Sequence, residues 1–429
     1  MATSSSSGRA SYKLIPDATD PESTFDYGTI GKSPDAVGIA VAEDAQGDDT
    51  DNASIDSAGG LERWNSPPIN AYRFGTSCFA LFVLGMHDGS LGALLPYIGP
   101  YYGVNYTTVS TVFVVPFIGY VITALTNNWI HNNFGQRGVA FMAPVCHSAY
   151  NAWVGNMHQA NELLGLMHGA YGLGATISPL VATTMVTKLH LEWYTFFYIM
   201  IAVNALELAV GVSSFWTATG AAYRERLQKD SAGREATPLS TVLRNSVTWF
   251  ISIFLLGYVG AEVSLGGWIP TFMIEVRHVS GFLAGVTATM FWLGLTLGRV
   301  VLGFITGRIG ERLAIFFYLL LCVVSQLLYW LVPNFIAAIV FVVMLGFFLG
   351  PLFPAAIVVA AKLMPPEHHV SAIGFAAAIG SGGAAIIPFV VGAVAQHKGV
   401  EVLQPIVVAI LIFIILIWLI LPGGFERGY

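Results

Sequence analysis

The sequence predicts an all-α membrane protein built from two related sets of helices. Hydrophobic residues make up 55% of the 429 residues and charged residues only 10%, whereas soluble domains keep about a quarter of their residues charged. One pattern, an acid, any residue, Ser-Leu-Gly, three residues and Pro, occurs twice, from Asp88 to Pro96 and from Glu262 to Pro270. An acid inside an apolar segment is costly. Its recurrence at matching places is typical of a carrier made of two related halves.

Residues 1–70 differ in composition from the rest of the chain. They hold twelve Asp/Glu and four Lys/Arg, whereas the remainder holds thirteen and fifteen. They contain no apolar run like that of a signal peptide, and they cannot bury enough apolar surface to offset the entropy of ordering. We therefore expect a disordered cytoplasmic tail. The overall acidity then says nothing about a substrate, and no basic tract indicates nucleic acid.

Eleven apolar stretches approach the length of about 20 residues that a membrane-spanning helix needs. They lie at 73–97, 107–129, 138–157, 164–187, 193–217, 246–274, 281–305, 312–332, 335–361, 370–395 and 402–422. The longest polar interruption, 218–245, contains five Lys/Arg. Because basic loops mark the cytoplasmic side, we expect a cytoplasmic linker there. It separates a first helix bundle, 71–217, from a second, 246–429.

The internal repeat explains why the number of segments is odd. The turn at 135–137 matches the turn at 310–312 with an offset of 175, but residues 174–179 match 383–388 with an offset of 209. The first half therefore lacks 34 residues that the second half has. We expect 138–157 to be the fused remnant of two helices. A deletion, alternative splicing, a gene-model error and a helix that evolved as a single one all remain open.

The charge of the linker constrains the path of this remnant. With a cytoplasmic N-terminus, a single crossing by 138–157 would place the basic linker outside, against the positive-inside bias. About twenty residues at 1.5 Å per residue cannot cross twice. We therefore expect 138–157 to be re-entrant, tilted or poorly packed.

The two turns resemble a motif of the major facilitator superfamily, Gly-x3-Asp-Arg-x-Gly-Arg-x-Arg. The matching residues are Gly135 and Arg137 in the first copy and Gly303, Arg308, Gly310 and Arg312 in the second. The usual Asp is replaced by Asn132 in the first copy and by Gly307 in the second. Both copies are degenerate, and their placement in a twofold repeat carries the resemblance.

Three further stretches resemble a fungal group related to the fucose/galactose–proton symporters. They are residues 87–92, 166–172 and 260–268. The resemblance covers about residues 70–425. It implies twelve helices in two six-helix bundles, alternating access, and a central cavity lined mainly by helices 1, 4, 7 and 10. This chain departs from that pattern with its eleven segments.

Five ionisable residues within the apolar segments are candidates for proton coupling. They are Asp88, Glu262, His87, His168 and Glu207. A carboxyl at this depth is expected to be protonated, paired or open to water. A carboxyl that binds a proton from one side and releases it to the other meets the need of a proton-coupled carrier. The competing interpretation is a paired or hydrogen-bonded structural residue.

Three residues are candidates for contacts with a sugar, namely Asn151, Trp153 and Trp268. An indole stacks on the apolar face of a pyranose ring, and an amide bonds to hydroxyl groups. Packing or anchoring at the membrane interface is the alternative for each.

The first functional hypothesis is a secondary transporter, a symporter of protons with a sugar or similar small polar molecule. Efflux of amphipathic compounds is the second, and a non-transporting or defective splice form is the third. No nucleophile–base or metal-ligand spacing favours an enzyme, a metal or another cofactor. The expected partners are a small-molecule substrate, protons and the lipid bilayer, and the expected oligomeric state is a monomer. The membrane is the plasma membrane, the vacuolar membrane or another endomembrane.

Overall fold

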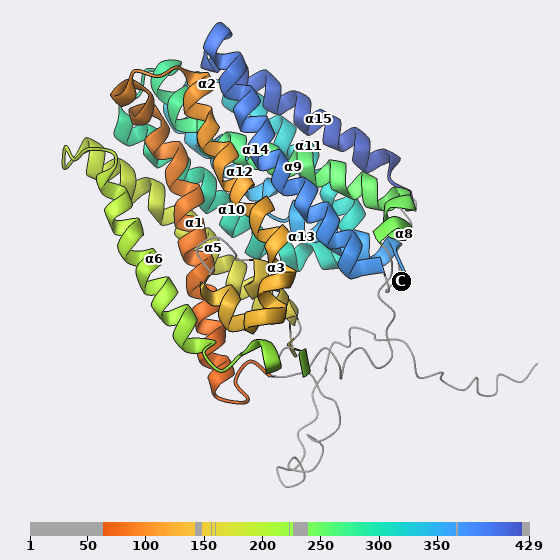
Figure 1. The fold of residues 1–429 in the computed structure, drawn as a ribbon. Helices are drawn as coiled ribbons and strands as arrows, with labels where there is room; N and C mark the ends of the chain where they lie inside the picture. The colour runs from red at the N-terminus through yellow and green to blue at the C-terminus, as the bar shows by residue number, and fades with distance from the viewer. Residues whose placement is uncertain are drawn as a thin grey trace, which may run out of the picture. The chain divides into compact units, whose positions relative to one another are not determined.

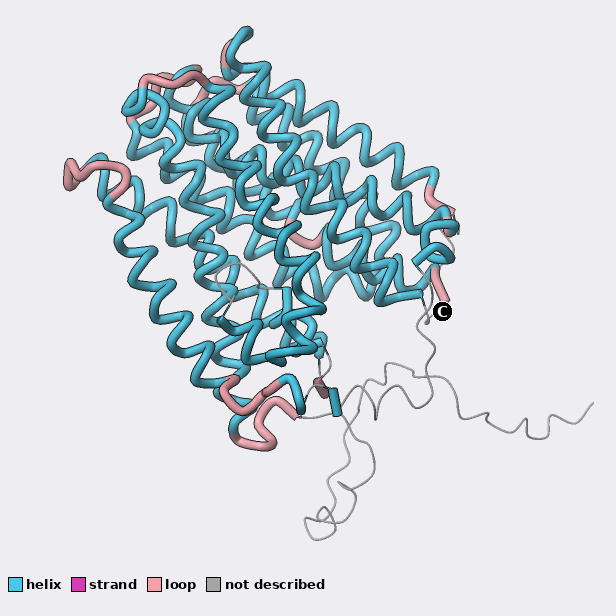
Figure 2. The backbone as a smooth tube through the Cα atoms, in the orientation of Figure 1, coloured by secondary structure: helices cyan, strands magenta, loops and turns pink. Residues whose placement is uncertain are grey.

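A computed structural model describes residues 63–141, 148–155, 157–158, 160–222, 224–225, 239–365 and 368–422 (Figure 1). In this part of the chain the regular structure is helical and contains no strand (Figure 2). The expected all-α fold is therefore confirmed. The expected tail up to residue 62 and the middle of the expected linker, 226–238, lie outside the described residues.

The first half contains four long helices and two short ones, and α1 packs on α5 and α6. The helices are α1 (Ile69–Tyr102), α2 (Tyr106–Val109), the 3-10 turn η1 (Ser110–Phe113), α3 (Val114–Phe141), α4 (Ser148–Gly155), α5 (Ala160–Thr187) and α6 (Thr195–Ser214). α1 stops at Gly103, whose φ of 63° is left-handed and suits glycine. Asn105 then accepts a hydrogen bond from the Thr108 amide and starts α2. The chain thus reverses direction within a few residues.

The second half contains six spans and one short helix. Its helices are α8 (Leu239–Arg244), α9 (Ser246–Glu275), α10 (Gly281–Ile309), α11 (Glu311–Leu331), α12 (Phe335–Leu349), α13 (Leu352–Leu363), α14 (His369–Lys398), the 3-10 turn η4 (Val400–Val402) and α15 (Leu403–Ile420). α12 and α13 follow one another as a single span, Phe335–Leu363.

Eight helices of the described part are long and apolar enough to cross a membrane. Two of them, α1 and α6, lie in the first half, and six lie in the second. Eight of the eleven expected segments therefore appear as candidate spans. The expected segments 107–129, 138–157 and 164–187 do not meet the same criterion, although α3 and α5 each have 28 residues.

We call the end of the molecule at which α1 finishes the outer end, and the opposite end the inner end. Arg73, near the start of α1, donates a hydrogen bond to the Ser214 carbonyl at the end of α6, 3.1 Å. The first half therefore begins and finishes at the inner end. Trp268, in the last third of α9, packs against Tyr106 of α2 at the outer end, so α9 starts at the inner end. Both ends of the linker are consequently at the inner end.

The expected remnant at 138–157 is described only in part, because 142–147 and 156 lie outside the described residues. α3 extends to Phe141, and α4 has eight residues, whereas a span needs about 20. Tyr150 and Val154 of α4 belong to the same buried cluster as Phe74 and Phe215, which lie near the start of α1 and just after α6. α4 therefore lies at the inner end, and the expectation that 138–157 is not a well-packed crossing helix stays a prediction.

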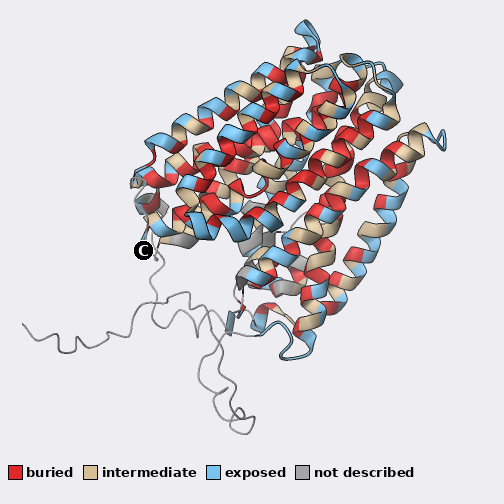
Figure 3. Cartoon of the chain, turned by 180° about the vertical axis from the view of Figure 1, so that it is seen from behind, coloured by how far each residue is buried: buried red, intermediate tan, exposed pale blue. Residues whose placement is uncertain are grey.

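Buried side chains lie where helices face each other, and apolar side chains also cover the outside (Figure 3). Examples of the latter are Phe304, Ile336 and Ile201, which are 76%, 72% and 65% exposed. Exposed apolar surface on this scale is not found on soluble monomers. It indicates a protein that is surrounded by lipid.

The sequence repeat corresponds to a repeat of helix packing. A Cβ on Gly174 of α5 would lie 2.0 Å from the Phe82 carbonyl of α1, and one on Gly383 of α14 would lie 2.1 Å from the Leu256 carbonyl of α9. Gly174 and Gly383 are 209 residues apart, and Phe82 and Leu256 are 174 apart. Equivalent helices therefore make the same contact in each half. The extra residues of the second half lie between α9 and α14.

Candidate functional site

The glycines of the two repeated motifs meet where α1 crosses α9. A Cβ on Gly92 would lie 1.9 Å from the carbonyl oxygen of Gly266, so this approach requires glycine at position 92. Asp88 and Glu262 each lie four residues earlier, about one helical turn from the crossing. The repeated motif therefore brings both acids to the junction of the two halves.

Asp88 is bonded to a tyrosine of the neighbouring helix. The Tyr171 hydroxyl of α5 donates a hydrogen bond to Asp88 Oδ2, 2.8 Å. The same two helices touch backbone to backbone, because a Cβ on Gly85 would lie 2.0 Å from the Tyr171 carbonyl and one on Gly89 2.3 Å from the Ala175 carbonyl. These glycines lie on both sides of Asp88 in the sequence. They hold the carboxylate and the phenol at short range.

Glu262 is paired with an arginine of the second half. Its Oε1 lies 3.0 Å from Arg299 Nη2 of α10, and Glu262 is only 5% exposed. A buried carboxylate of this kind depends on its partner, because removing the partner leaves an uncompensated charge. Arg299 also donates to the Gly350 carbonyl, 3.4 Å. This bond ties the ion pair to the turn between α12 and α13.

The Asp88–Tyr171 hydrogen bond and the Glu262–Arg299 ion pair are joined through the ring of Tyr171. The guanidinium carbon of Arg299 lies 5.6 Å from the centroid of the Tyr171 ring, within the range of a cation–π interaction. Asp88, Tyr171, Arg299 and Glu262 thus form a continuous chain of contacts from α1 through α5 and α10 to α9. We call these four residues the central network. Two of them belong to each half, so the network spans the junction.

The sequence predicts the two acids of this network, Asp88 and Glu262, but not their partners, Tyr171 and Arg299. Arg299 carried a usable signal, because a charged side chain within the apolar segment 281–305 is as costly as an acid. The sequence interpretation considered acids and histidines at that depth and left the arginine out. Tyr171 occurred within one of the resembling stretches, but nothing in the sequence distinguishes a bonding tyrosine from a packing one.

The predicted histidines and Glu207 lie around the network. His87 faces α6, where its Nε2 is 3.1 Å from the amide nitrogen of Asn204. Glu207 lies on the same helix, three residues further, and is fully buried. His168 precedes Tyr171 by about one turn, is exposed, and lies within electrostatic range of Arg299. Of these three, His168 lies on the helix that carries a network residue.

Two of the expected sugar contacts lie at the inner end of the first half. Trp153 packs edge-on against Phe215, with ring centroids 5.3 Å apart. Asn151 lies two residues earlier on α4, and its Oδ1 is buried without a hydrogen-bond partner among the described residues. The indole of Trp153 therefore has a packing contact here.

Trp268 lies on the outer side of the α1–α9 crossing. It is fully buried, and its Nε1 donates to the Pro388 carbonyl of α14, 3.0 Å. Its ring contacts Tyr106 and Phe113 of the first half. In this arrangement Trp268 closes the junction between the halves, and its faces are covered by protein.

The two turn motifs share a glycine with positive φ and an arginine that contacts the end of a later helix. Gly135 and Gly310 both have positive φ, 70° and 94°, which favours glycine. Arg137 stacks over Trp216 just after α6, 5.3 Å from the ring centroid. Arg312 donates to the Leu421 carbonyl just after α15. Each turn thus binds the end of the last helix of its own half.

The other two motif residues, Gly303 and Arg308, are exposed on the inner part of α10. No atom of the described residues lies within 4 Å of a Cβ built on Gly303. These two positions therefore make no packing contact with a second helix in this arrangement.

The outer ends of the two halves are in contact. A Cβ on Gly285 of α10 would lie 2.0 Å from Thr183 of α5, and one on Gly392 of α14 would lie 2.5 Å from Ser110. Toward the inner end, Cβ atoms built on Gly165 and Gly169 of α5 would meet no described atom within 4 Å. The halves therefore meet at their outer ends, and no other described helix covers α5 at these two glycines.

The chemistry available at the network is that of proton and solute binding. Arg299 pairs with Glu262, and Asp88 accepts a hydrogen bond from Tyr171. Among the described residues no group of three or more His, Cys, Asp or Glu side chains is placed to hold a metal ion. The donors and acceptors present suit a proton and the hydroxyl groups of a small molecule.

Comparisons with known proteins agree with this geometry. A model of the Major Facilitator Superfamily matches residues 138–335 and 275–427. The chain is 30% identical over 415 residues to the Bypass of stop codon protein 6 of Saccharomyces cerevisiae, with 82% of this chain and 83% of that protein covered. It is 20% identical over 301 residues to the Glucose/mannose transporter GlcP of Bacillus subtilis, with 67% and 71% covered.

A solved structure shows the same fold. The nucleoside transporter NupG, crystallised as a point mutant, matches with a TM-score of 0.58 at 12% identity, covering 82% of this chain and all of that one. The likeness concerns the arrangement of the helices.

Proposed function

Because the chain belongs to the major facilitator superfamily, we propose that it is a secondary transporter that couples protons to the movement of a small polar solute of the sugar class. The observation that carries the proposal is the central network, which links an acid of each half across their junction. A carrier of this kind must bind its proton and its solute in both conformations, that is, with the halves open to one side of the membrane and open to the other. A chain of contacts shared between the halves supports that requirement.

In this proposal Asp88 carries the proton. Ionised Asp88 accepts the Tyr171 hydrogen bond, and bonds to charged groups contribute about 1.5–3 kcal/mol. A proton on Asp88 weakens that bond and leaves the Tyr171 ring, which rests on Arg299, less firmly held. Protonation of Asp88 in the first half thereby changes the surroundings of the Glu262–Arg299 ion pair in the second half. Glu262 keeps Arg299 in place rather than releasing a proton.

The sugar class rests on two supports. The network offers a carboxylate and a phenol, the imidazole of His168 lies about one turn from Tyr171 on the same helix, and all three kinds of group bond to hydroxyls. The Bacillus relative is a glucose/mannose transporter by name. Of the three expected sugar contacts, Asn151 is retained in the proposal because its Oδ1 is buried and without a partner among the described residues, whereas Trp153 and Trp268 are assigned to packing.

The orientation, membrane and assembly belong to the same proposal. The basic linker starts and finishes at the inner end, so we place that end, with the N-terminus, in the cytoplasm. The membrane is the plasma membrane or an endomembrane such as the vacuolar one. The functional unit is one chain.

One observation favours a different outcome, a shortened chain that does not transport. α4 has eight residues where the second half has the span Phe335–Leu363. The match to the yeast protein runs over 415 positions yet includes only 82% of the 429 residues, so that protein has residues opposite gaps in this chain. Efflux of amphipathic compounds is the remaining alternative within the transporter class.

Purified protein in proteoliposomes tests these three outcomes. An imposed proton gradient, acidic on the side from which solute is taken, should drive accumulation of labelled D-glucose, D-mannose or D-galactose above equilibrium, and a protonophore should abolish it. Accumulation of an amphipathic dye against the proton gradient would instead show efflux. Absence of flux for every solute, with folded protein by circular dichroism, would support the non-transporting form.

A further inference from the structure

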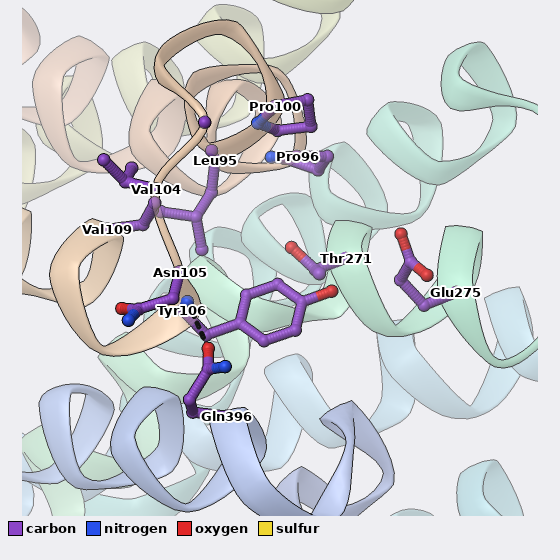
Figure 4. Close-up of a pocket in the computed structure, with 12 residues that line it drawn as sticks. Leu95, Pro96, Pro100, Val104, Asn105, Tyr106, Val109, Thr271, Glu275 and Gln396 are labelled. Carbon is purple, nitrogen blue, oxygen red and sulfur yellow. Dashed lines mark hydrogen bonds between the residues drawn. The ribbon is translucent and has the colours of Figure 1, made fainter.

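A cavity lies at the outer end of the molecule, and none of the four residues of the central network lines it. Its volume is about 280 Å³, and its walls come from the end of α1, the α1–α2 connection, and the ends of α9 and α14. Figure 4 shows Tyr106 reaching across it toward Thr271 and Glu275, with Gln396 on the opposite wall. The cavity therefore bridges the two halves.

The polar groups of this outer cavity are placed for a ligand. Thr271 is 2% exposed, and its hydroxyl has no hydrogen-bond partner among the described residues. A buried polar group without a partner is costly, and here it points into a cavity. Gln396 Oε1 already accepts from the Tyr106 amide, 2.8 Å, so its amide nitrogen is oriented by that bond and left to donate. Glu275 supplies an acceptor at the rim.

The size and the mixture of groups indicate the class of ligand. Sites for drug-sized ligands measure about 300–1,000 Å³, so a cavity of this volume suits a smaller molecule. Leu95, Pro96 and Pro100 give it one apolar wall, and hydroxyl, amide and carboxylate groups line the other. A neutral polyol of monosaccharide size has an apolar ring face and several hydroxyls and matches both walls.

We propose that this cavity is an outer binding site for a small neutral polyol and that its occupation holds the outer ends of the halves together. Tyr106 belongs to the first half, and Thr271, Glu275 and Gln396 belong to the second, so the site is complete only while the two ends touch. A ligand shifts a conformational equilibrium toward the state that it binds better. A polyol arriving from outside therefore opposes the opening that uptake requires, and acts as an inhibitor there.

The polyol class rests on the proposed function, but the test does not require transport. The full chain carrying Val104→Cys, at the wall of the cavity, is placed in lipid nanodiscs. Its reaction with a hydrophilic maleimide is followed by mass spectrometry of the peptide that contains position 104. D-glucose, D-mannose and mannitol are the probes. A ligand that excludes the reagent slows labelling by a factor of 1 + [L]/Kd, about elevenfold at ten times Kd.

Two further variants identify the groups that bind. Thr271→Val keeps the shape and removes the hydroxyl, and Glu275→Gln removes the charge from an exposed position. Loss of one hydrogen bond should raise the concentration for half-protection by about 2- to 12-fold. Gly75→Ala should leave the protection unchanged, because Gly75 does not line this cavity and nothing lies within 4 Å of its Cβ.

The outcomes separate the two proposals. Protection without proton-driven uptake supports the outer site and counts against the proposed transport. Uptake without protection by any of the three probes overturns the outer site alone. Protection that is equal in Thr271→Val, Glu275→Gln and the parent also overturns it, because the polyol then acts elsewhere.

Discussion

At the scale of single residues, Asp88 is the acid that accepts a hydrogen bond from Tyr171. We expect Asp88→Asn to abolish proton-driven accumulation and to retain part of the exchange of solute between the two sides of the membrane. Asparagine still accepts a hydrogen bond from Tyr171 but cannot carry a proton. The measurement is counterflow beside gradient-driven uptake in proteoliposomes. Uphill uptake by the variant equal to that of the parent protein would show that Asp88 does not carry the coupled proton.

The Glu262–Arg299 pair makes a separate prediction about stability. Glu262→Gln and Arg299→Gln should each destabilise the protein, because each leaves a buried charge without its partner, a loss of about 3–5 kcal/mol. The double variant should lose less than the sum of the two. Thermal unfolding of the purified protein in detergent provides the double-mutant cycle. Additive losses would mean that the 3.0 Å contact contributes no coupling.

At this scale the sequence reveals the two acids of the central network but not their partners, for a physical reason. An acid in an apolar segment is conspicuous because its cost is high wherever the helix lies, so Asp88 and Glu262 were found. Their partners depend on which helices face each other. Tyr171 meets Asp88 only because Gly85 and Gly89 allow α1 and α5 to touch. Trp268, a candidate sugar contact with packing as the alternative, packs against aromatic rings of the other half, and no feature of a single helix reveals that contact.

At the scale of helices, the crossing of α1 and α9 controls whether the outer ends stay together. Gly92→Ala should force these helices apart, because its Cβ would lie 1.9 Å from the Gly266 carbonyl. We expect faster maleimide labelling of the Val104→Cys variant and reduced transport. Gly75→Ala is the matched control on the same helix, since nothing lies within 4 Å of its Cβ and alanine favours helix. Equal labelling rates in the two variants would show that the crossing does not close the outer end.

The repeat in the sequence predicted the packing of helices better than their number. The offsets of 174 and 209 recur in the contacts Gly174–Phe82 and Gly383–Leu256, because close backbone contacts need glycine at both equivalent places. The eleven apolar stretches were counted by composition alone. Composition cannot show where a helix stops, and the expected segment 138–157 contains both the end of α3 at Phe141 and the eight-residue α4.

At the scale of the whole molecule, α3 packs on α6 and α14 among the described residues, but one face of it stays exposed. In the second half α10 packs closely on α12, with a Cβ on Gly298 only 1.9 Å from the Phe347 carbonyl. On α3, by contrast, Val115, Ile118 and Ile122 are 64%, 52% and 54% exposed. Inserting a copy of residues 323–356 after His147 should cover this face, and buried apolar area contributes about 25 cal/mol per Å².

The lengthened protein should therefore unfold at a higher temperature and transport faster than the present chain. Thermal unfolding and initial uptake rates, compared at equal protein in the same lipid, provide the measurement. A control insertion of equal length, with the same residues in scrambled order, should not stabilise the protein. Equal or lower stability of the lengthened protein would show that α3 needs no further partner and that α4 is its complete neighbour.

The path of the chain through the membrane gives the last prediction. α6 ends beside the start of α1, and α9 begins at the same end, so the number of crossings before the linker must be even. The five basic residues between 218 and 245 then place that end in the cytoplasm. An epitope tag inserted within 226–238 should be reached by antibody only after intact cells are permeabilised.

A second tag serves as the control for this topology experiment. Inserted between Lys188 and Glu192, at the opposite end of α5, it should be reached without permeabilisation and shows that the antibody works. Labelling of the linker tag on intact cells would mean that residues 138–157 cross the membrane once or that the whole chain is inverted. Both cases hide the second tag, and a further tag after Gly103 in the α1–α2 connection distinguishes them, because inversion alone would hide that one.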